Sequence, residues 1–150
     1  MAQSLSKVII HIIFSTKNRE RTITPDITQK LHAYLATACR DQDCQAYRVG
    51  GVTDHVHLAV RLGRTITQSR LLEEIKRGSS KWTKTQGPQH SGFSWQKGFG
   101  CFSISPGHLD KLITYIDRQE EHHKTISFKD EFRSLCQKYS VDFDERYCRD

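Results

Sequence analysis

The chain has 150 residues and a mass of 17.4 kDa, the size of a single domain spanning residues 1–150 with a buried core. Its longest apolar run, Val8 to Phe14, is far shorter than the ~20 residues that a membrane span needs. The first residues also lack the basic and apolar segments of a signal peptide. The five cysteines form no Cys-x-x-Cys pair, which argues against a disulfide scaffold or a zinc ribbon. We therefore expect a cytoplasmic, reduced protein in which Cys136 and Cys148 serve as packing residues.

The net charge of +6 is concentrated in the middle of the chain. Residues 61–109 hold eight Lys/Arg and two Asp/Glu, whereas the segments before and after them carry net charges of only +2 and −2. A basic stretch within a folded domain is typical of a phosphate-binding surface, although a solvated helix face can carry the same charges. The charge distribution thus modestly favours a nucleic acid as the partner.

Hydrophobic periodicity and turn residues predict an alternating series of strands and helices. Residues 7–15 form a β-branched and aromatic strand, with Val8, Ile10, Ile12 and Phe14 on one face. In chain order there follow a helix over 24–41, strands over 45–52 and 55–62, a helix around 71–82, a loop at 86–92, a strand over 99–105, a helix beginning at Ser105-Pro106, and a helix beginning at Ser127.

This order is the split βαβ pattern of a ferredoxin-like domain, which is shared by RNA-recognition (RRM-like) domains. It predicts an α+β fold, βαββαβ, with an antiparallel sheet, two helices on one face and additional C-terminal helices. The opposite face of the sheet is either open or covered by those C-terminal helices. By analogy with this topology, the first strand lies beside the third.

His55-Val56-His57 lies on the third predicted strand. Residues i and i+2 of a strand share a face, so the two imidazoles project together while Val56 points into the core. Two imidazoles at this spacing can converge on one metal ion. The alternative is two polar residues on an exposed strand face.

Tyr115 and Gln119 are one helical turn apart on the same face of the predicted third helix. Leu112, Ile113 and Ile116 supply the apolar side of this helix, so Tyr115 is not needed there. A phenol has a pKa near ~10 and needs a metal or a base to act as a nucleophile. A half-buried tyrosine bonded to a neighbour is the alternative.

Together these motifs resemble a known family. Asp54-His55-Val56-His57 resembles the His-hydrophobe-His motif of the HUH nucleases. Tyr115-x-x-x-Gln119 resembles the catalytic helix of the single-tyrosine (IS200-like) transposases of bacterial insertion sequences and their REP-associated relatives. The likeness continues through 14–17, 95–100 and 119–124, and so covers most of the chain.

The resemblance implies a transposase that cleaves and rejoins single-stranded DNA. Tyr115 would be the nucleophile and form a 5′-phosphotyrosine link, and His55, His57 and Gln119 would bind one divalent metal ion, Mg²⁺ or Mn²⁺. The partners implied are hairpin-containing element ends or REP-like sequences and a second copy of the chain in a homodimer, with no membrane and no small-molecule substrate. The resemblance and the basic segment together suggest DNA contacts at Arg70, Lys76, Arg77, Lys81, Lys84 and Lys97.

Other polar and aromatic residues have two interpretations each. His11 would stand near the metal ligands if the first strand borders the third, or it is a packing residue at a sheet edge. Asp54 could orient an imidazole, or serve only in a turn. His122 and His123 suit a helix C-terminus and are not assigned to the metal. Phe93, Trp95 and Phe99 could stack on unpaired bases or belong to the core.

Two alternatives to an active transposase remain open. One is a domesticated, REP-associated nuclease that no longer mobilises its own gene. The other is a non-catalytic, RRM-like module that binds single-stranded nucleic acid, although the first and fourth strands lack the aromatic and basic signature of such modules.

Overall fold

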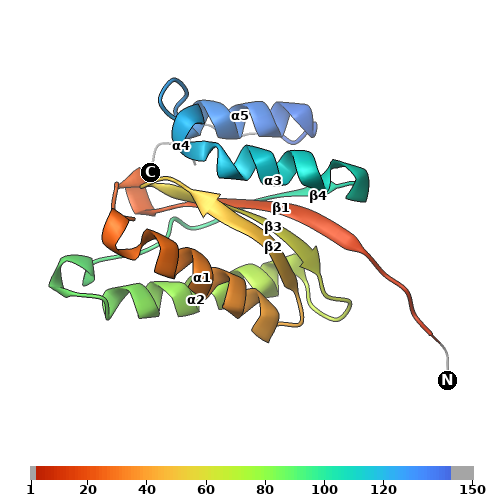
Figure 1. Ribbon diagram of the computed structural model, residues 1–150, viewed down its shortest axis with the longest axis horizontal. Coiled ribbons are helices and arrows are strands. Elements are labelled where there is room, and N and C mark those ends of the chain that lie inside the picture. Colours follow the sequence, from red (N-terminus) through yellow and green to blue (C-terminus); the bar gives the residue numbers. More distant parts are fainter. Residues whose placement is uncertain (1–2, 143–150) are drawn as a thin grey trace.

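The computed structural model describes residues 3–142, which form a four-stranded sheet between two layers of helices (Figure 1). The strands are β1 (Val8–Ser15), β2 (Gln45–Gly51), β3 (His55–Leu62) and β4 (Gly100–Ile104). The helices are α1 (Pro25–Asp41), α2 (Gln68–Lys84), α3 (Leu109–Asp117), α4 (Gln119–His122) and α5 (Phe128–Lys138), with 3-10 turns at Lys17–Arg19, Pro88–His90 and Pro106–His108. The βαββαβ order with C-terminal helices confirms the predicted α+β, ferredoxin-like class.

The strands lie in the order β2-β3-β1-β4, and each neighbouring pair is antiparallel. The central position of β1 follows from its sequence, because both of its faces are apolar. Ile10, Ile12 and Phe14 belong to the main core on one side, and Ile13 packs into a second cluster on the other. Val8 departs from the predicted alternation because it begins the strand and remains 46% exposed. The pairing of β1 with β3 confirms the expected neighbourhood of the first and third strands.

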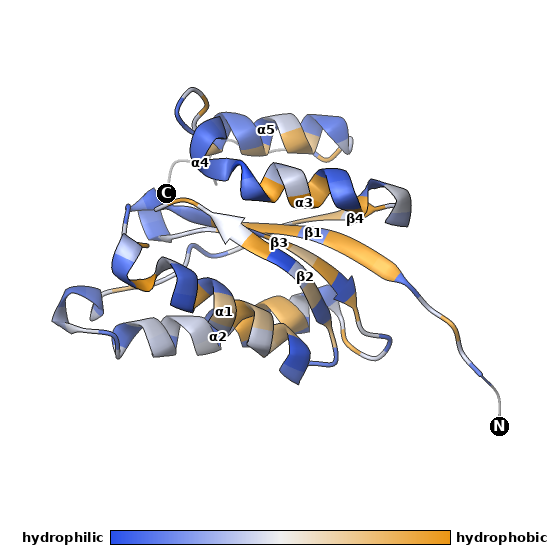
Figure 2. Cartoon of the chain, viewed as in Figure 1, coloured by the Kyte–Doolittle hydropathy of each residue, from blue (hydrophilic) through white to orange (hydrophobic). Residues whose placement is uncertain are grey.

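Helices α1 and α2 cover one face of the sheet and bury an apolar stripe each against it (Figures 1 and 2). Pro25 opens α1, and the Thr67 side chain accepts a hydrogen bond from the Arg70 amide at the start of α2. Phe93 and Trp95 also belong to this core, and the Trp95 indole donates to Ser79 Oγ at 2.9 Å. These two aromatic residues are therefore packing residues.

Helices α3, α4 and α5 cover the opposite face, the second of the two arrangements expected from the sequence (Figure 1). Two glycines let them approach closely. A Cβ on Gly50 of β2 would lie 2.7 Å from Ile116 Cγ2 of α3, and one on Gly100 of β4 would lie 2.8 Å from Phe132 Cε2 of α5. Ser127 caps α5 as predicted, since its side chain accepts from the Asp130 amide.

The predicted single helix running from Ser105-Pro106 past Gln119 is wrong in two places. A 3-10 turn at Pro106–His108 precedes α3, and the chain leaves the α-helical conformation at Arg118, where φ is −100° and ψ is 16°. The Arg118 amide bonds back to the carbonyls of Thr114 and Tyr115, which closes α3 before Gln119 begins α4. Tyr115 and Gln119 thus lie on separate helices.

Within residues 3–142, none of the helices combines the length and apolar character required to cross a membrane. Cys39, Cys44 and Cys101 are free thiols, and Cys136 is buried as a packing residue. Cys148 lies outside the described residues.

Candidate metal centre and nucleophile

His55 and His57 project together from β3 onto the face covered by α3, α4 and α5. The alternation of the strand sends Val56 and Leu58 into the main core on the other side, as the sequence predicted. Both imidazoles are completely buried rather than exposed. Burying two polar rings costs free energy unless their nitrogens have hydrogen-bond or metal partners. The contacts of the four ring nitrogens therefore show what this site can do.

The Nδ1 atoms of both histidines have partners outside the pair. His55 Nδ1 lies 2.7 Å from Asp54 Oδ1, and His57 Nδ1 lies 2.7 Å from His11 Nε2. The His11 and His57 rings stack with centroids 5.0 Å apart. His11 and Asp54 thus fix the orientation of the two imidazoles, and each Nε2 is free to face the centre of the site.

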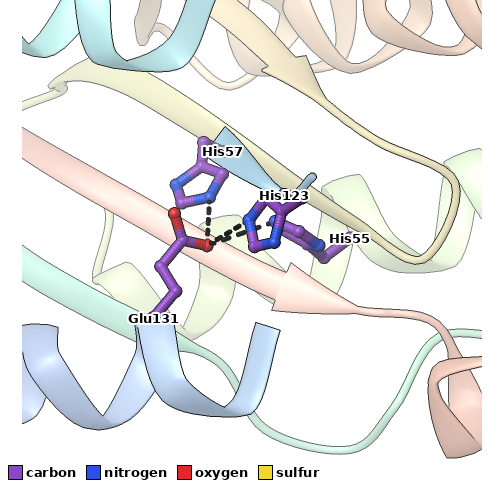
Figure 3. Close-up of side chains that lie close together, drawn as sticks. All are labelled: His55, His57, His123 and Glu131. Atoms are coloured by element: carbon purple, nitrogen blue, oxygen red, sulfur yellow. Dashed lines mark hydrogen bonds and ion pairs between the residues drawn. The ribbon is translucent and has the colours of Figure 1, made fainter. Parts of the chain in front are cut away.

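Two residues from the C-terminal helical region complete the cluster. His123, just after α4, and Glu131 on α5 lie against the histidine pair (Figure 3). Glu131 Oε1 is 3.3 Å from His55 Nε2, 3.1 Å from His57 Nε2 and 3.0 Å from His123 Nε2. One ligand atom from each of the four residues lies within 4.8 Å of the others, so the cluster could hold a metal ion.

The hydrogen bonds on the outer ring nitrogens support a cation at the centre. His123 Nδ1 donates to the carbonyl of Ile126 at 2.6 Å, and His55 Nδ1 donates to a carboxylate. In a neutral imidazole whose Nδ1 carries the proton, Nε2 presents a lone pair. Lone pairs that face the oxygen of Glu131 repel it unless a proton or a metal ion lies between them. A proton on His55 meets this requirement in the metal-free chain, and the same donor set also fits a divalent cation in its place.

Tyr115 and Gln119 reach the same carboxylate from the other side. The Tyr115 hydroxyl donates to Glu131 Oε2, and Gln119 Nε2 donates to the same oxygen at 3.0 Å. Gln119 Oε1 lies 3.1 Å from His55 Nε2. The structure thus brings together Tyr115, Gln119 and the two histidines, although the helix break separates the first two.

The pKa values of the histidines follow from burial and from the carboxylates of Asp54 and Glu131. Burial lowers the pKa of His57 to about 4 and that of His11 to about 3. Burial also acts to lower the pKa of His55, but hydrogen bonds to Asp54 and Glu131 outweigh it and raise the pKa to about 9. A metal ion at this site would have to displace the proton that His55 carries at neutral pH.

Glu131 and Tyr115 are shifted in opposite directions. Burial acts to raise the pKa of Glu131, but its hydrogen bonds to three histidines hold it far below the usual range. Burial and the adjacent carboxylate raise the pKa of Tyr115 well above that of a free phenol. In the metal-free chain Glu131 is a carboxylate and Tyr115 a neutral phenol.

His123 was not assigned to the metal from the sequence and Glu131 was not singled out, yet the structure brings both side chains against the histidine pair, in a cluster that could hold a metal ion. His123 was interpreted as a cation at a helix C-terminus, but the turn after α4 carries its ring into the cluster (Figure 3). A signal for Glu131 was present. Glu131 lies three residues after Phe128 and four before Leu135, so its carboxylate occupies a position in the apolar stripe of an amphipathic helix.

The basic residues proposed from the sequence lie on the other layer. Arg70, Lys76, Arg77, Lys81 and Lys84 belong to α2, across the sheet from the cluster, and Lys97 lies beyond α2 in the loop before β4 (Figure 1). Arg70 and Arg77 pair with Glu74 on their own helix. Lys76 donates to the carbonyls of Gln96 and Gly98 at 2.6 and 2.7 Å, which holds this loop.

Comparison with known proteins gives a family match and a fold match. A family model described as "Transposase IS200 like" matches residues 4–119. A proposed transposase from Deinococcus radiodurans has a similar structure, with a TM-score of 0.61 and 17% identity over 79% of this chain and 98% of that one. A REP-associated tyrosine transposase bound to a REP hairpin also has a TM-score of 0.61, with 16% identity over 84% of this chain and 74% of that one. No curated protein matches the chain. The family match ends before His123 and Glu131.

Proposed function

Because this chain belongs to the IS200-like transposase family, we propose that it cleaves and rejoins single-stranded DNA through Tyr115. One observation carries the proposal: the Tyr115 hydroxyl bonds to Glu131, and three histidine nitrogens converge on the Oε1 atom of this carboxylate. A nucleophile and a set of metal ligands therefore share one site, which is the combination that metal-assisted cleavage of a phosphodiester by a protein nucleophile uses.

The metal ligands in this proposal are His55, His57 and Gln119, supplemented by His123 and Glu131. Imidazole together with carboxylate and amide oxygen is a mixed donor set, and of Mg²⁺ and Mn²⁺ it suits Mn²⁺ better. Such an ion supplies positive charge that polarises the scissile phosphate and favours the phenolate form of the tyrosine. The outer hydrogen bonds, from His55 to the Asp54 carboxylate and between His57 and His11, hold the two imidazoles in position for such an ion.

The chain's own residues position the nucleophile and manage its proton. Glu131 accepts the hydrogen bond of the phenol and thereby fixes the direction of the Tyr115 oxygen. Because the pKa of Tyr115 is raised, the tyrosine stays protonated and unreactive in the metal-free chain. His55 and His57 are completely buried whereas Tyr115 is half-buried, so the tyrosine is placed to meet the substrate.

The proposed reaction exchanges one phosphate ester for another. The phenol loses its proton, its oxygen attacks the phosphorus, and the bond from phosphorus to the 3′ oxygen breaks. The departing 3′ oxygen takes up a proton, and the 5′ phosphate remains on Tyr115. Attack by a 3′-OH on this link reverses the sequence, so strands are rejoined without ATP.

The proposed partners are a DNA hairpin and a second copy of the chain. The relative bound to a REP hairpin supports a hairpin-containing substrate here, whether the chain mobilises its own gene or serves as a domesticated nuclease. The contacts of the site are complete within one chain. A homodimer that exchanges its α3 helices at the 105–107 joint would form the same contacts between subunits, and this is the assembly we propose.

The α2 cations Arg70, Lys76, Arg77, Lys81 and Lys84, together with Lys97, have a separate role in this proposal. Since α2 lies on the layer opposite Tyr115, its basic face would contact DNA away from the scissile phosphate. Such contacts raise affinity without sequence information and weaken with salt.

Separating cleavage from binding tests the proposed function. His57→Ala removes a ligand of the site, and we expect it to abolish cleavage of a labelled single-stranded hairpin oligonucleotide in Mn²⁺. Binding of the same oligonucleotide should remain within a few-fold of the parent, because affinity comes from Lys/Arg contacts elsewhere. His32→Ala, on the half-buried His32 of α1, is the matched control. Equal loss of binding and cleavage in a folded variant would contradict the proposed role.

A further inference from the structure

A cavity of about 630 Å³ lies between the end of β4, α3 and α5. Its inner wall contains Tyr115 and Glu131, so it leads directly to the proposed nucleophile. The volume falls within the range of sites that hold a ligand of nucleotide size. None of the residues singled out from the basic α2 segment lines it.

Two lysines stand on opposite walls of this cavity. Lys111 belongs to α3 and Lys138 to the last turn of α5, and both side chains are exposed. Glu131 is the one carboxylate in the lining, and it is engaged with Tyr115, Gln119 and the histidines. The charge available to a ligand in the cavity is therefore positive.

Besides aliphatic side chains and histidines, the lining has hydroxyl groups and one aromatic platform. Ser103 and Ser105 are exposed at the β4 end, where such hydroxyls can donate to phosphate oxygens. Tyr139 is half-buried, its ring stacks on Phe102 with centroids 4.8 Å apart, and Lys138 Nζ lies 5.5 Å from its centre. Phe102 covers one face of this ring and Lys138 Nζ lies over the ring, so an unpaired base stacks on Tyr139 once Lys138 turns toward a phosphate.

We propose that this cavity holds the nucleotide next to the scissile phosphate of single-stranded DNA, with Lys111 and Lys138 binding the backbone phosphates on either side and Tyr139 stacking on the base. This assignment rests on the proposed function, because Tyr115 selects a phosphodiester as the occupant. In this assignment the DNA strand that is cleaved lies between α3 and α5, on the layer opposite the α2 cations.

Salt-dependent binding of a short single-stranded oligonucleotide without a hairpin tests the lysines. In the full chain with EDTA, Lys111→Gln/Lys138→Gln should make the negative slope of log affinity against log salt shallower by about 1.4, or 0.7 per phosphate contact. Lys7→Gln/Lys30→Gln removes the same charge from exposed positions outside the cavity and should leave the slope near that of the parent. Equal slopes for the two double variants would overturn the proposal.

A second pair of variants tests the stacking platform. Tyr139→Leu should weaken binding of the same oligonucleotide at least about fivefold, whereas Tyr139→Phe keeps the ring and should bind like the parent. Equal affinity of the two folded variants would remove Tyr139 from the site. If the parent chain forms the covalent adduct but the two lysine double variants have equal salt slopes, the cavity assignment is refuted and the proposed function is retained. A lysine-dependent slope in a chain that never forms the adduct would instead retain the cavity and refute the proposed function.

Discussion

Replacing His11 with leucine tests how far the proposed metal site depends on a residue outside the proposed ligand set. His11 is 2% exposed, and its Nε2 lies 2.7 Å from His57 Nδ1, so the substitution removes the group that orients His57. Loss of such an orienting partner costs metal sites about 10–100-fold in affinity. This corresponds to about 1.4–2.7 kcal/mol, which agrees with the ~1–3 kcal/mol cost of leaving a buried polar group without its hydrogen bond.

Calorimetric titration with Mn²⁺ measures the effect directly. We expect His11→Leu to bind Mn²⁺ about 10–100-fold more weakly than the parent, and His32→Leu, on the opposite layer, to bind it normally. In a His57→Ala background the His11 substitution should have little further effect, because its partner is already gone. Normal affinity in His11→Leu, or fully additive losses in the double variant, would refute the inference that His11 acts through His57.

Three further predictions concern the metal-free stability, the assembly and the basic face. Because the pKa of His57 is lowered, the unfolded chain binds more protons than the folded chain below pH 6.5, and stability falls as the pH drops from 6.5 to about 4. Because the pKa of His55 is raised, the folded chain binds more protons above pH 6.5, and stability falls as the pH rises from 6.5 to about 9. The melting temperature in EDTA should therefore peak near pH 6.5, and a steady rise from pH 5 to 9 would contradict these shifts. Mixing Tyr115→Phe with His57→Ala subunits should restore cleavage if sites are shared in a homodimer, whereas a mixture that stays inactive would place each site within one chain. Lys81→Gln/Lys84→Gln should make the negative slope of log affinity against log salt for a hairpin oligonucleotide shallower by about 1.4, and an unchanged slope would leave α2 as a solvated face.

The part of the site that lies on strands could be predicted from the sequence. The period of two in β3 places His55 and His57 on one face, and the βαββαβ order places β1 beside β3. These two facts bring His11 against His57, and the neighbouring carboxylate of Asp54 reaches His55. Local pattern and topology were sufficient because a strand fixes the direction of every side chain.

The part contributed by the C-terminal helices could not be predicted in the same way. Their periodicity shows that α5 is amphipathic, but not which face of the sheet it covers or how it is rotated. Glu131 lies 74 residues beyond His57, and the contact depends on how α5 packs over β4, where Gly100 leaves room for Phe132. The break at Arg118 likewise depends on local backbone bonds that a helical period does not reveal.

The central claim is that Tyr115 forms the covalent bond to DNA. Incubation of the full chain with Mn²⁺ and a labelled single-stranded hairpin oligonucleotide should give an adduct on a denaturing gel, and mass spectrometry of its peptides should place the phosphate on Tyr115. Tyr115→Phe should abolish the adduct. Tyr47 is a half-buried tyrosine on β2 that packs against Leu112 and Ile116 of α3, and Tyr47→Phe should retain the adduct. An adduct that persists in Tyr115→Phe would move the nucleophile to another tyrosine, such as Tyr34, Tyr47, Tyr139 or Tyr147 (the last outside the described residues), and would contradict the account.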